Sequence, residues 1–217
     1  MAHIGIMGGT FNPIHKGHIK LAQAAYEQYH LDKVLFMPAG DPPHKKDAAI
    51  VSAKHRMNMV KLAIEGISYF EPSAIEIERE GYTYTFETLK ELQGQNTEDE
   101  LYFILGGDSL FQIEKWYKPH EIFNRCILLA ANRDDVPKDE FLSKIEYLNS
   151  KYNADVRPID TPMMHISSTE IRNALSDNEL DTSDDVNTKL VDSKVVQYII
   201  KHHLYEQTGN DEETNNE

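Results

Sequence analysis

The residues best suited to chemistry lie at 8–18, where the sequence reads GGTFNPIHKGH. Gly8 and Gly9 follow a short apolar run, where a backbone that turns tightly or approaches a ligand needs glycine. His15 and His18 stand three positions apart at the predicted start of a helix, so both imidazoles can face one bound group. The amides and dipole of a helix N-terminus favour an anion. The segment therefore predicts a phosphate site, in which the histidines neutralise developing charge and need not act as bases.

Other interpretations of this segment stay open on the residues alone. A single histidine is more often an ordinary surface or packing residue. The two histidines favour a phosphate site because they occur together with glycines directly after a predicted strand. A zinc site is disfavoured, because the sequence contains no His-Glu-x-x-His pattern and no cysteine partner for these histidines. The spacing fits neither a Walker A loop nor the dinucleotide pattern GxGxxG.

A second group of polar residues reads ISSTEIR at 166–172. Ser167, Ser168 and Thr169 open a predicted helix, and Arg172 follows one turn later on the same side as Ser168. Hydroxyl groups and a guanidinium in this arrangement suit a phosphate. Hydroxyl residues at a helix start are also ordinary N-caps, which is the simpler interpretation of this motif on its own.

The elements that position these residues alternate between strand and helix. Strands are predicted at 3–7, 33–37, 73–78, 101–105, 126–131 and 155–159, and helices at 17–29, 52–65, 85–93, 137–151, 168–175 and 191–204. The alternation predicts one α/β domain over residues 1–205, with a Rossmann-like, doubly wound, mostly parallel sheet and helices on both faces. Such sheets bind ligands at the carboxyl ends of their strands, near the switch in strand order.

Charge and composition limit the possible partners. The net charge is −14, but the stretches 177–185 and 206–217, which lack lysine and arginine, supply ten of these negative charges. We expect them to be a solvated loop and an acidic disordered tail. The sequence has no basic stripe for nucleic acid and no apolar run of about 18 residues for a membrane. The single cysteine, Cys126, excludes an intramolecular disulfide, and a reducing, cytoplasmic setting fits.

Together these motifs resemble the HxGH nucleotidylyltransferase superfamily, and within it most closely the bacterial nicotinate-nucleotide adenylyltransferase family. The two motifs carry the resemblance, and the segments PPHK at 42–45, YTYT at 82–85, LGGD at 105–108 and KWY at 115–117 make it specific. The resemblance covers residues 3–205 and leaves out the tail.

The resemblance implies an enzyme that joins ATP to nicotinate mononucleotide, giving deamido-NAD and pyrophosphate, with Mg²⁺ accompanying ATP. The acceptor phosphate would attack the α-phosphate in line, without a covalent intermediate. His15, His18 and Arg172 would be catalytic, with His18 stabilising charge at the α-phosphate. The residues implied to bind ATP belong to the two motifs and to the LGGD segment: Gly8, Gly9, Thr10, Phe11, His15, His18, Gly106, Asp108, Ile166, Ser167, Ser168 and Arg172.

For the acceptor, the resemblance implies that Trp116 stacks on the pyridine ring, beside Tyr84. The backbone N–H groups of Thr85 and Tyr117 would donate hydrogen bonds to the nicotinate carboxylate, and Lys45 would bind the mononucleotide phosphate. An aromatic face suits a flat ring, and amide donors prefer a carboxylate to a carboxamide. On the residues alone, Trp116 could equally be a core tryptophan, and Lys45 a solvated loop lysine.

One residue departs from the family pattern, because position 12 is Asn where many relatives carry Asp. Both residues favour turns, so the loop is expected to survive, but no protein side chain is assigned as a metal ligand. Two competing functions stay open: another adenylyltransferase of the superfamily, such as phosphopantetheine adenylyltransferase, and a catalytically silent nucleotide sensor. A homo-oligomer is compatible with the sequence.

Overall fold

The computed structural model describes residues 1–40, 50–132, 136–161, 166–176 and 190–206. In these residues, six strands form one parallel sheet in the order β3-β2-β1-β4-β5-β6. The strands are β1 (His3–Gly9), β2 (Lys33–Pro38), β3 (Phe70–Pro72), β4 (Glu100–Gly106), β5 (Ile127–Ala131) and β6 (Val156–Ile159). Strand order reverses between β1 and β4, which confirms the predicted doubly wound sheet and sets the expected ligand crevice beside these two strands.

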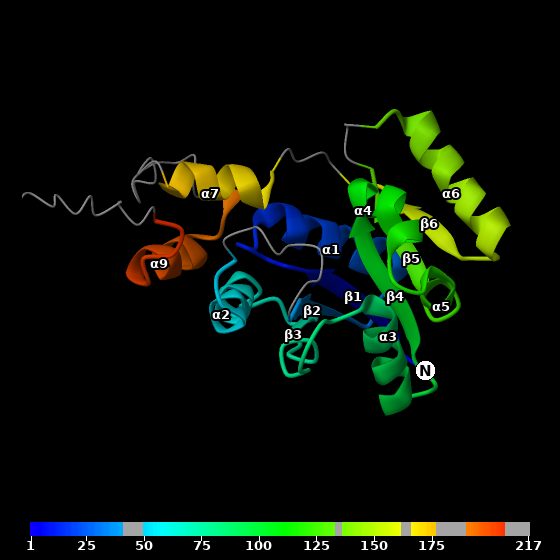
Figure 1. Cartoon of the computed structure of the whole chain (residues 1–217), viewed down its shortest axis with the longest axis horizontal. Helices are drawn as coiled ribbons and strands as arrows, with labels where there is room; N and C mark the ends of the chain where they lie inside the picture. The colour runs from blue at the N-terminus through cyan, green and yellow to red at the C-terminus, as the bar shows by residue number, and fades with distance from the viewer. Residues whose placement is uncertain (41–49, 133–135, 162–165, 177–189, 207–217) are drawn as a thin grey trace, which may run out of the picture.

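Helices cover both faces of the sheet, as predicted (Figure 1). One face carries α1 (Lys16–Tyr29), α2 (Ala53–Ala63), α7 (Ser168–Ser176) and α9 (Ser193–Lys201). The other face carries α3 (Thr85–Gln95), α4 (Gly107–Gln112), α5 (Pro119–Phe123) and α6 (Lys138–Tyr152), with the short 3-10 helix η1 (Ile113–Lys115). In Figure 1, α2, α7 and α9 gather at one end of the sheet and α6 lies at the other.

Two apolar cores follow from the strand period of two residues. In β1, Met7 joins the core under α1 and α2, whereas Ile4 and Ile6 join the core under α3 to α6. The central strands β1 and β4 are buried on both faces, which explains why they read as continuous apolar runs. Their burial fixes the register, in which Ile6 pairs with Phe103.

The third strand was predicted in the wrong place. It spans Phe70–Pro72, and residues 73–78 contain a turn at 75–77 and no strand. Pro72 has no N–H for a ladder bond, and strands commonly end or stay at the sheet edge at such a residue. The apolar residues of 73–78 are explained without a strand, because Ile75 packs from this turn against the core under α3.

Three short helical elements, α4, η1 and α5, were not predicted, and α9 ends at Lys201 rather than at 204. The acidic stretch 177–185 and residues 207–217 lie outside the described residues, so the predicted tail and domain boundary stay predictions. Cys126 is buried and free. Where the chain is described, no helix is both long enough and apolar enough to span a membrane.

Candidate active site

An open cleft lies at the carboxyl ends of β1 and β4, where the strand order reverses. Its volume is about 430 Å³, within the range of small-molecule sites. Nine of the residues predicted from the sequence line it: Gly8, Gly9, Thr10, His18, Tyr84, Thr85, Gly106, Trp116 and Tyr117. Both predicted halves of the site, for nucleotide and for acceptor, therefore open into one cleft.

Residues Gly8–His15, here called the phosphate loop, lead from the end of β1 to the start of α1, and Gly8, Gly9 and Thr10 line the cleft. Phe11 adopts a left-handed backbone conformation, with φ of 49°, which is uncommon for a bulky side chain. Its ring is 2% exposed and packs against Phe36 and the edge of His18. The ring of Phe11 is thus an anchor in the core, and only its backbone remains for the predicted nucleotide contact.

His15 and His18 form a stacked pair at the start of α1. Their ring centroids are 3.7 Å apart, and the backbone N–H of His15 donates to Nδ1 of His18 at 3.2 Å. Because Nδ1 of His18 accepts, a neutral His18 carries its proton on Nε2, which makes that nitrogen a donor. His18 lines the cleft, whereas His15 is 4% exposed and lies behind it. The geometry thus separates the pair into a residue at the cleft and a residue that supports it.

The second motif lies against the phosphate loop, although the two are far apart in sequence. Ser168 Oγ donates to the carbonyl of Pro13 at 2.9 Å, and Arg172 donates to the carbonyl of Asn12 at 2.9 Å. Ser167 forms a reciprocal capping box with Glu170. The backbone N–H of Glu170 donates to the Ser167 hydroxyl, and the backbone N–H of Ser167 donates to the Glu170 carboxylate. The N-cap interpretation is therefore confirmed for Ser167.

Several predicted residues do not line the cleft. Ile166 is buried in the core, Ser168 and Arg172 contact the phosphate loop from the α7 side, and Ser167 is hydrogen-bonded to Glu170. Asp108 is exposed in the first turn of α4. Lys45 lies outside the described residues. Where the chain is described, no three His, Cys, Asp or Glu side chains group closely enough to hold a metal ion.

Asn12, the departure from the family pattern, has a clear structural role. Its side chain belongs to a residue that is 5% exposed, and its Oδ1 accepts from the Val51 amide at 3.2 Å and from the Tyr205 hydroxyl at 2.8 Å. Both contacts need an acceptor at this position, which an amide oxygen supplies without a net charge.

Arg56 is a residue of the site that sequence reasoning did not single out. It is 2% exposed, and its guanidinium donates to the carbonyls of Thr10, Gly40 and Val51. Burial lowers the pKa of the guanidinium, because the charged form loses water. Within the described residues it has no carboxylate partner, so it acts as a fixed positive charge beneath the phosphate loop. The sequence carries little signal for this role, because the burial of Arg56 depends on contacts with Thr10 and Gly40.

Aromatic residues form the acceptor side of the cleft. Trp116 is half-buried and packs edge-on against Phe103, with ring centroids 6.0 Å apart, while also lining the cleft. The rings of Tyr84 and Tyr117 lie 4.6 Å apart. Thr85 is the first residue of α3, and first-turn amides lack partners within their own helix. The arrangement offers aromatic surface and backbone donors beside each other.

Glu76 and Thr83 also line the cleft. Glu76 was missed because residues 73–78 were expected to be a strand, and Thr83 belongs to the quoted segment 82–85 but was not assigned to the site. Burial raises the pKa of the Glu76 carboxyl, while a hydrogen bond from Thr88 and the charge of Arg79 oppose this shift. A half-buried carboxylate near the acceptor side would disfavour a second anion there unless these partners compensate it.

Comparison with known proteins identifies the class of protein that this fold and site define. Residues 6–174 match the cytidylyltransferase-like family, so the chain belongs to this family of nucleotidyltransferases. Within it, the chain is 43% identical to a "Probable nicotinate-nucleotide adenylyltransferase" of Lachnoclostridium phytofermentans, covering 94% of this chain and all of the relative. A protein of the same name from Carboxydothermus hydrogenoformans is 39% identical, covering 94% and 98% of the two chains.

A solved structure agrees with the fold. The nicotinic acid mononucleotide adenylyltransferase of Plasmodium falciparum, complexed with NaAD, superposes with a TM-score of 0.76 over 94% of this chain and 98% of its own. At 22% identity this likeness supports the fold alone. The sequence relatives carry the finer assignment, to the nicotinate-nucleotide adenylyltransferases.

Proposed function

We propose that this enzyme transfers the adenylyl group of ATP to nicotinate mononucleotide, giving deamido-NAD and pyrophosphate. The observation that carries the proposal is the single cleft at the β1–β4 switch point, which joins a phosphate loop to an aromatic acceptor side. A nucleotide triphosphate fits one half chemically, and a flat ring with a carboxylate fits the other.

On the phosphate side, an oxygen of the acceptor phosphate forms a bond to the α-phosphorus while the bond to the β-phosphate oxygen breaks in line. Pyrophosphate leaves with the electron pair. His18 donates from Nε2 toward the α-phosphate, and His15 holds it there by stacking. Ser167, Ser168 and Arg172 receive the leaving phosphates; Ser168 and Arg172 already lie at the loop through its carbonyls. Gly8, Gly9, Thr10, Gly106 and the backbone of Phe11 line the nucleotide path, with Asp108 and Ile166 at its edge.

On the acceptor side, Trp116 and Tyr84 pack against the pyridine ring. The backbone N–H groups of Thr85 and Tyr117 donate hydrogen bonds to the nicotinate carboxylate. These hydrogen bonds are charge-assisted and therefore stronger than those that a carboxamide would accept. Lys45 meets the mononucleotide phosphate.

Mg²⁺ enters with ATP. Asp108, an exposed carboxylate in the first turn of α4, would be the protein group that faces the ion beside the triphosphate. Bound there, the ion supplies charge neutralisation on the triphosphate. A cytoplasmic location and assembly into a homo-oligomer, both compatible with the sequence, complete the proposal.

Pyrophosphate release with a panel of acceptors tests this function. Nicotinate mononucleotide should exceed nicotinamide mononucleotide and phosphopantetheine by a wide margin; equal rates with the carboxamide would refute the carboxylate contacts. His18→Ala should lower kcat by about 10² to 10³-fold with smaller changes in KM, the usual effect of removing a transition-state donor. His120→Ala, an exposed histidine in α5, is the matched control and should keep normal turnover. Near-normal turnover of His18→Ala would refute the mechanism, and no turnover by the unmodified enzyme with any acceptor would favour the nucleotide sensor.

A further inference from the structure

Tyr205 connects the end of the described chain to the phosphate loop. Its hydroxyl donates to Asn12 Oδ1 at 2.8 Å, a contact between residues 193 positions apart in sequence. Tyr205 has a left-handed backbone, with φ of 69°, and so does His203, with φ of 51°. Non-glycine residues hold such conformations only where surrounding contacts over-determine them. The turn after α9 is therefore shaped to bring this phenol to the loop.

The phenol of Tyr205 is half-buried. Burial raises the pKa of Tyr205 above its usual range, which keeps the phenol protonated and able to donate. Its acceptor, Asn12, is itself 5% exposed and also receives the Val51 amide on the same oxygen. Because the acceptor is buried, this half-buried hydrogen bond has less competition from water than an exposed one, and it favours one orientation of the Asn12 side chain.

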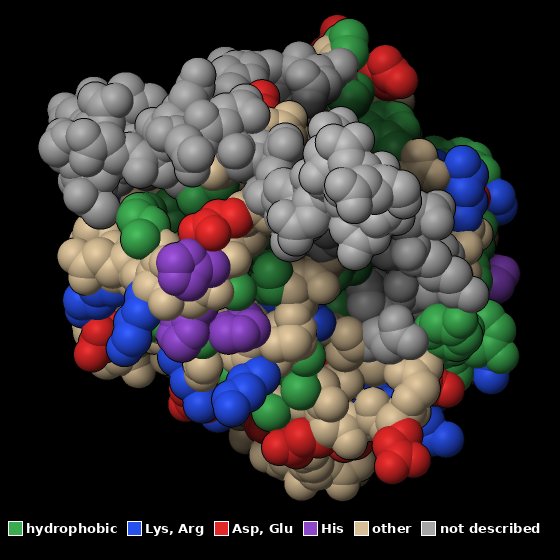
Figure 2. Space-filling view, turned by 60° about the vertical axis from the view of Figure 1, so that its left-hand side comes forward, with side chains coloured by type: hydrophobic (Ala, Val, Ile, Leu, Met, Phe, Trp, Pro, Cys, Tyr) green, Lys and Arg blue, Asp and Glu red, His purple; other side chains and the backbone are tan. Residues whose placement is uncertain are grey.

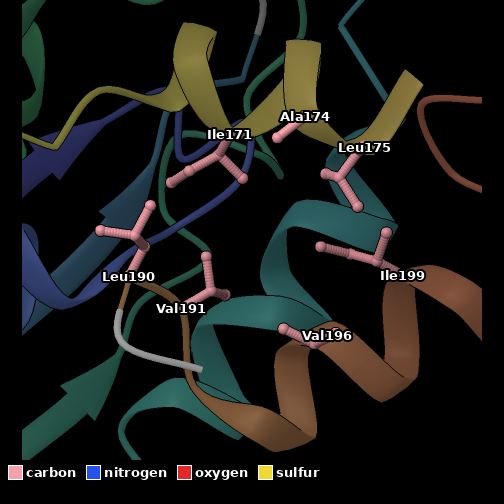
Figure 3. Close-up of a pocket in the computed structure, with 7 residues that line it drawn as sticks. All are labelled: Ile171, Ala174, Leu175, Leu190, Val191, Val196 and Ile199. Atoms are coloured by element: carbon pink, nitrogen blue, oxygen red, sulfur yellow. The ribbon is translucent and has the colours of Figure 1, made fainter. Parts of the chain in front are cut away.

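The turn after α9 is part of a larger unit. Apolar side chains of α7 and α9 face each other around a small cavity, as Figure 3 shows; they include Ile171 and Leu175 of α7, and Val196 and Ile199 of α9. Both helices contribute side chains to the core under α1, and α9 also packs on α2. The same unit thus supports both segments that donate hydrogen bonds to the phosphate loop, the α7 motif and the turn after α9.

Three hydrogen bonds from this unit end on two consecutive loop residues. Arg172 donates to the Asn12 carbonyl, Tyr205 to the Asn12 side chain, and Ser168 to the Pro13 carbonyl. His15 follows two residues after Pro13 and stacks on His18. A movement of Asn12 is therefore passed along a short, buried stretch of backbone to the imidazoles.

We propose that Tyr205 is a positioning residue for nucleotidyl transfer: through Asn12, its hydroxyl holds the phosphate loop in the conformation that presents His18 to the phosphates. The inference rests on the proposed function, because it concerns the same cleft. It makes the C-terminal turn part of the active-site scaffold, although Tyr205 does not line the cleft.

Tyr205→Phe tests the inference, because it removes only the donating oxygen. Tyr198→Phe is a matched control in the same helix–turn unit. The Tyr198 hydroxyl lies 2.9 Å from His55 Nδ1 and accepts from the side-chain Nδ2 of Asn58 at 2.8 Å. These contacts belong to the α2–α9 end of the molecule, on whose surface histidine side chains gather (Figure 2).

We expect both variants to lose a little thermal stability and only Tyr205→Phe to lose turnover. Loss of this hydrogen bond predicts about a fivefold to tenfold lower kcat, with KM for both substrates changed less than twofold. A Tyr205→Phe enzyme with normal kcat and a lowered Tm would overturn the proposal and leave Tyr205 a stabilising residue. Equal losses of kcat in both variants would overturn it too.

A double variant tests the route through Asn12. If Tyr205 acts through this residue, adding Tyr205→Phe to Asn12→Ala should lower kcat no further than Asn12→Ala alone. Additive losses would refute the route. The comparison uses whichever acceptor the unmodified enzyme accepts, so failure on nicotinate mononucleotide refutes the proposed function and leaves this test in place.

Discussion

Gly17 offers a direct test of whether the stacked histidines set the rate. It is the second residue of α1, between the two imidazoles in sequence. A Cβ at this position would lie 3.0 Å from Cε1 and Nδ1 of His15, whereas ordinary contacts begin at 3.4 Å. The His15 ring would therefore have to retreat by about 0.4 Å. His15 is 4% exposed and stacks on His18 at 3.7 Å, so the movement reaches His18.

The expected size of the effect follows from this displacement. A misplacement of about 1 Å in a catalytic group costs roughly 10²-fold in rate, so about 0.4 Å predicts roughly a fivefold to tenfold lower kcat for Gly17→Ala. Stability should change little, because alanine favours the helix more than glycine does and offsets part of the crowding. Steady-state pyrophosphate release gives kcat, and thermal unfolding gives Tm.

Gly94→Ala is the matched control, since a Cβ there meets nothing within 4 Å in α3. It should raise the free energy of unfolding by about 0.5 to 1 kcal/mol and leave kcat unchanged. The reasoning fails if Gly17→Ala keeps the kcat of the unmodified enzyme, because the imidazole pair would then tolerate displacement and could not be a precise charge stabiliser.

Two further predictions concern the acceptor side of the cleft and the ion pairs between Glu114 and α6. Trp116→Ala should raise KM for nicotinate mononucleotide by about tenfold, the effect of losing one stacked ring, without changing KM for ATP; steady-state kinetics decide, and an unchanged acceptor KM would contradict the stacking role. Hydrogen bonds from Lys144, then Lys151, lower the pKa of Glu114 from 4.5 to about 2. Because its pKa is lowered, the ionised Glu114 carboxylate stabilises the fold above pH 4.5, and this contribution is lost as pH falls toward 2. Glu114→Gln should therefore lower the free energy of unfolding by about 1 kcal/mol at pH 7, after solvent screening, and by almost nothing near pH 2. Denaturant unfolding at both pH values measures this, and a pH-independent difference would exclude the ion pairs as its source.

The fold could be predicted because its signals are local. The apolar runs of β1, β4 and β5 and the amphipathic periods of α1 and α2 each lie within one segment. The short helices α4 and α5 were missed because a few residues carry little periodicity, and their packing against the sheet defines them. The third strand was misplaced by an alternating pattern that a turn also uses to bury Ile75.

The residues of the site also differ in whether their signal is local or depends on long-range contacts. Residues in contiguous motifs, such as His18 and Trp116, were found where they line the cleft. Residues whose roles arise from contacts across the fold were not. Arg56 resembles any surface arginine until Thr10 and Gly40 are brought to it, and the link between Asn12 and Tyr205 joins opposite ends of the chain.

These distant contacts explain how an acidic protein can bind a triphosphate. Positive charge is concentrated at the phosphate loop by two buried or half-buried guanidinium groups, Arg56 and Arg172, both held by loop carbonyls. Hydrogen bonds to those carbonyls offset part of the desolvation of each charge and fix the backbone at the same time. The strained backbone of Phe11 stays in place because these contacts over-determine it. A preorganised loop has little reorganisation left to make when charge develops on the transferring phosphate, which is the condition under which His18 is most effective.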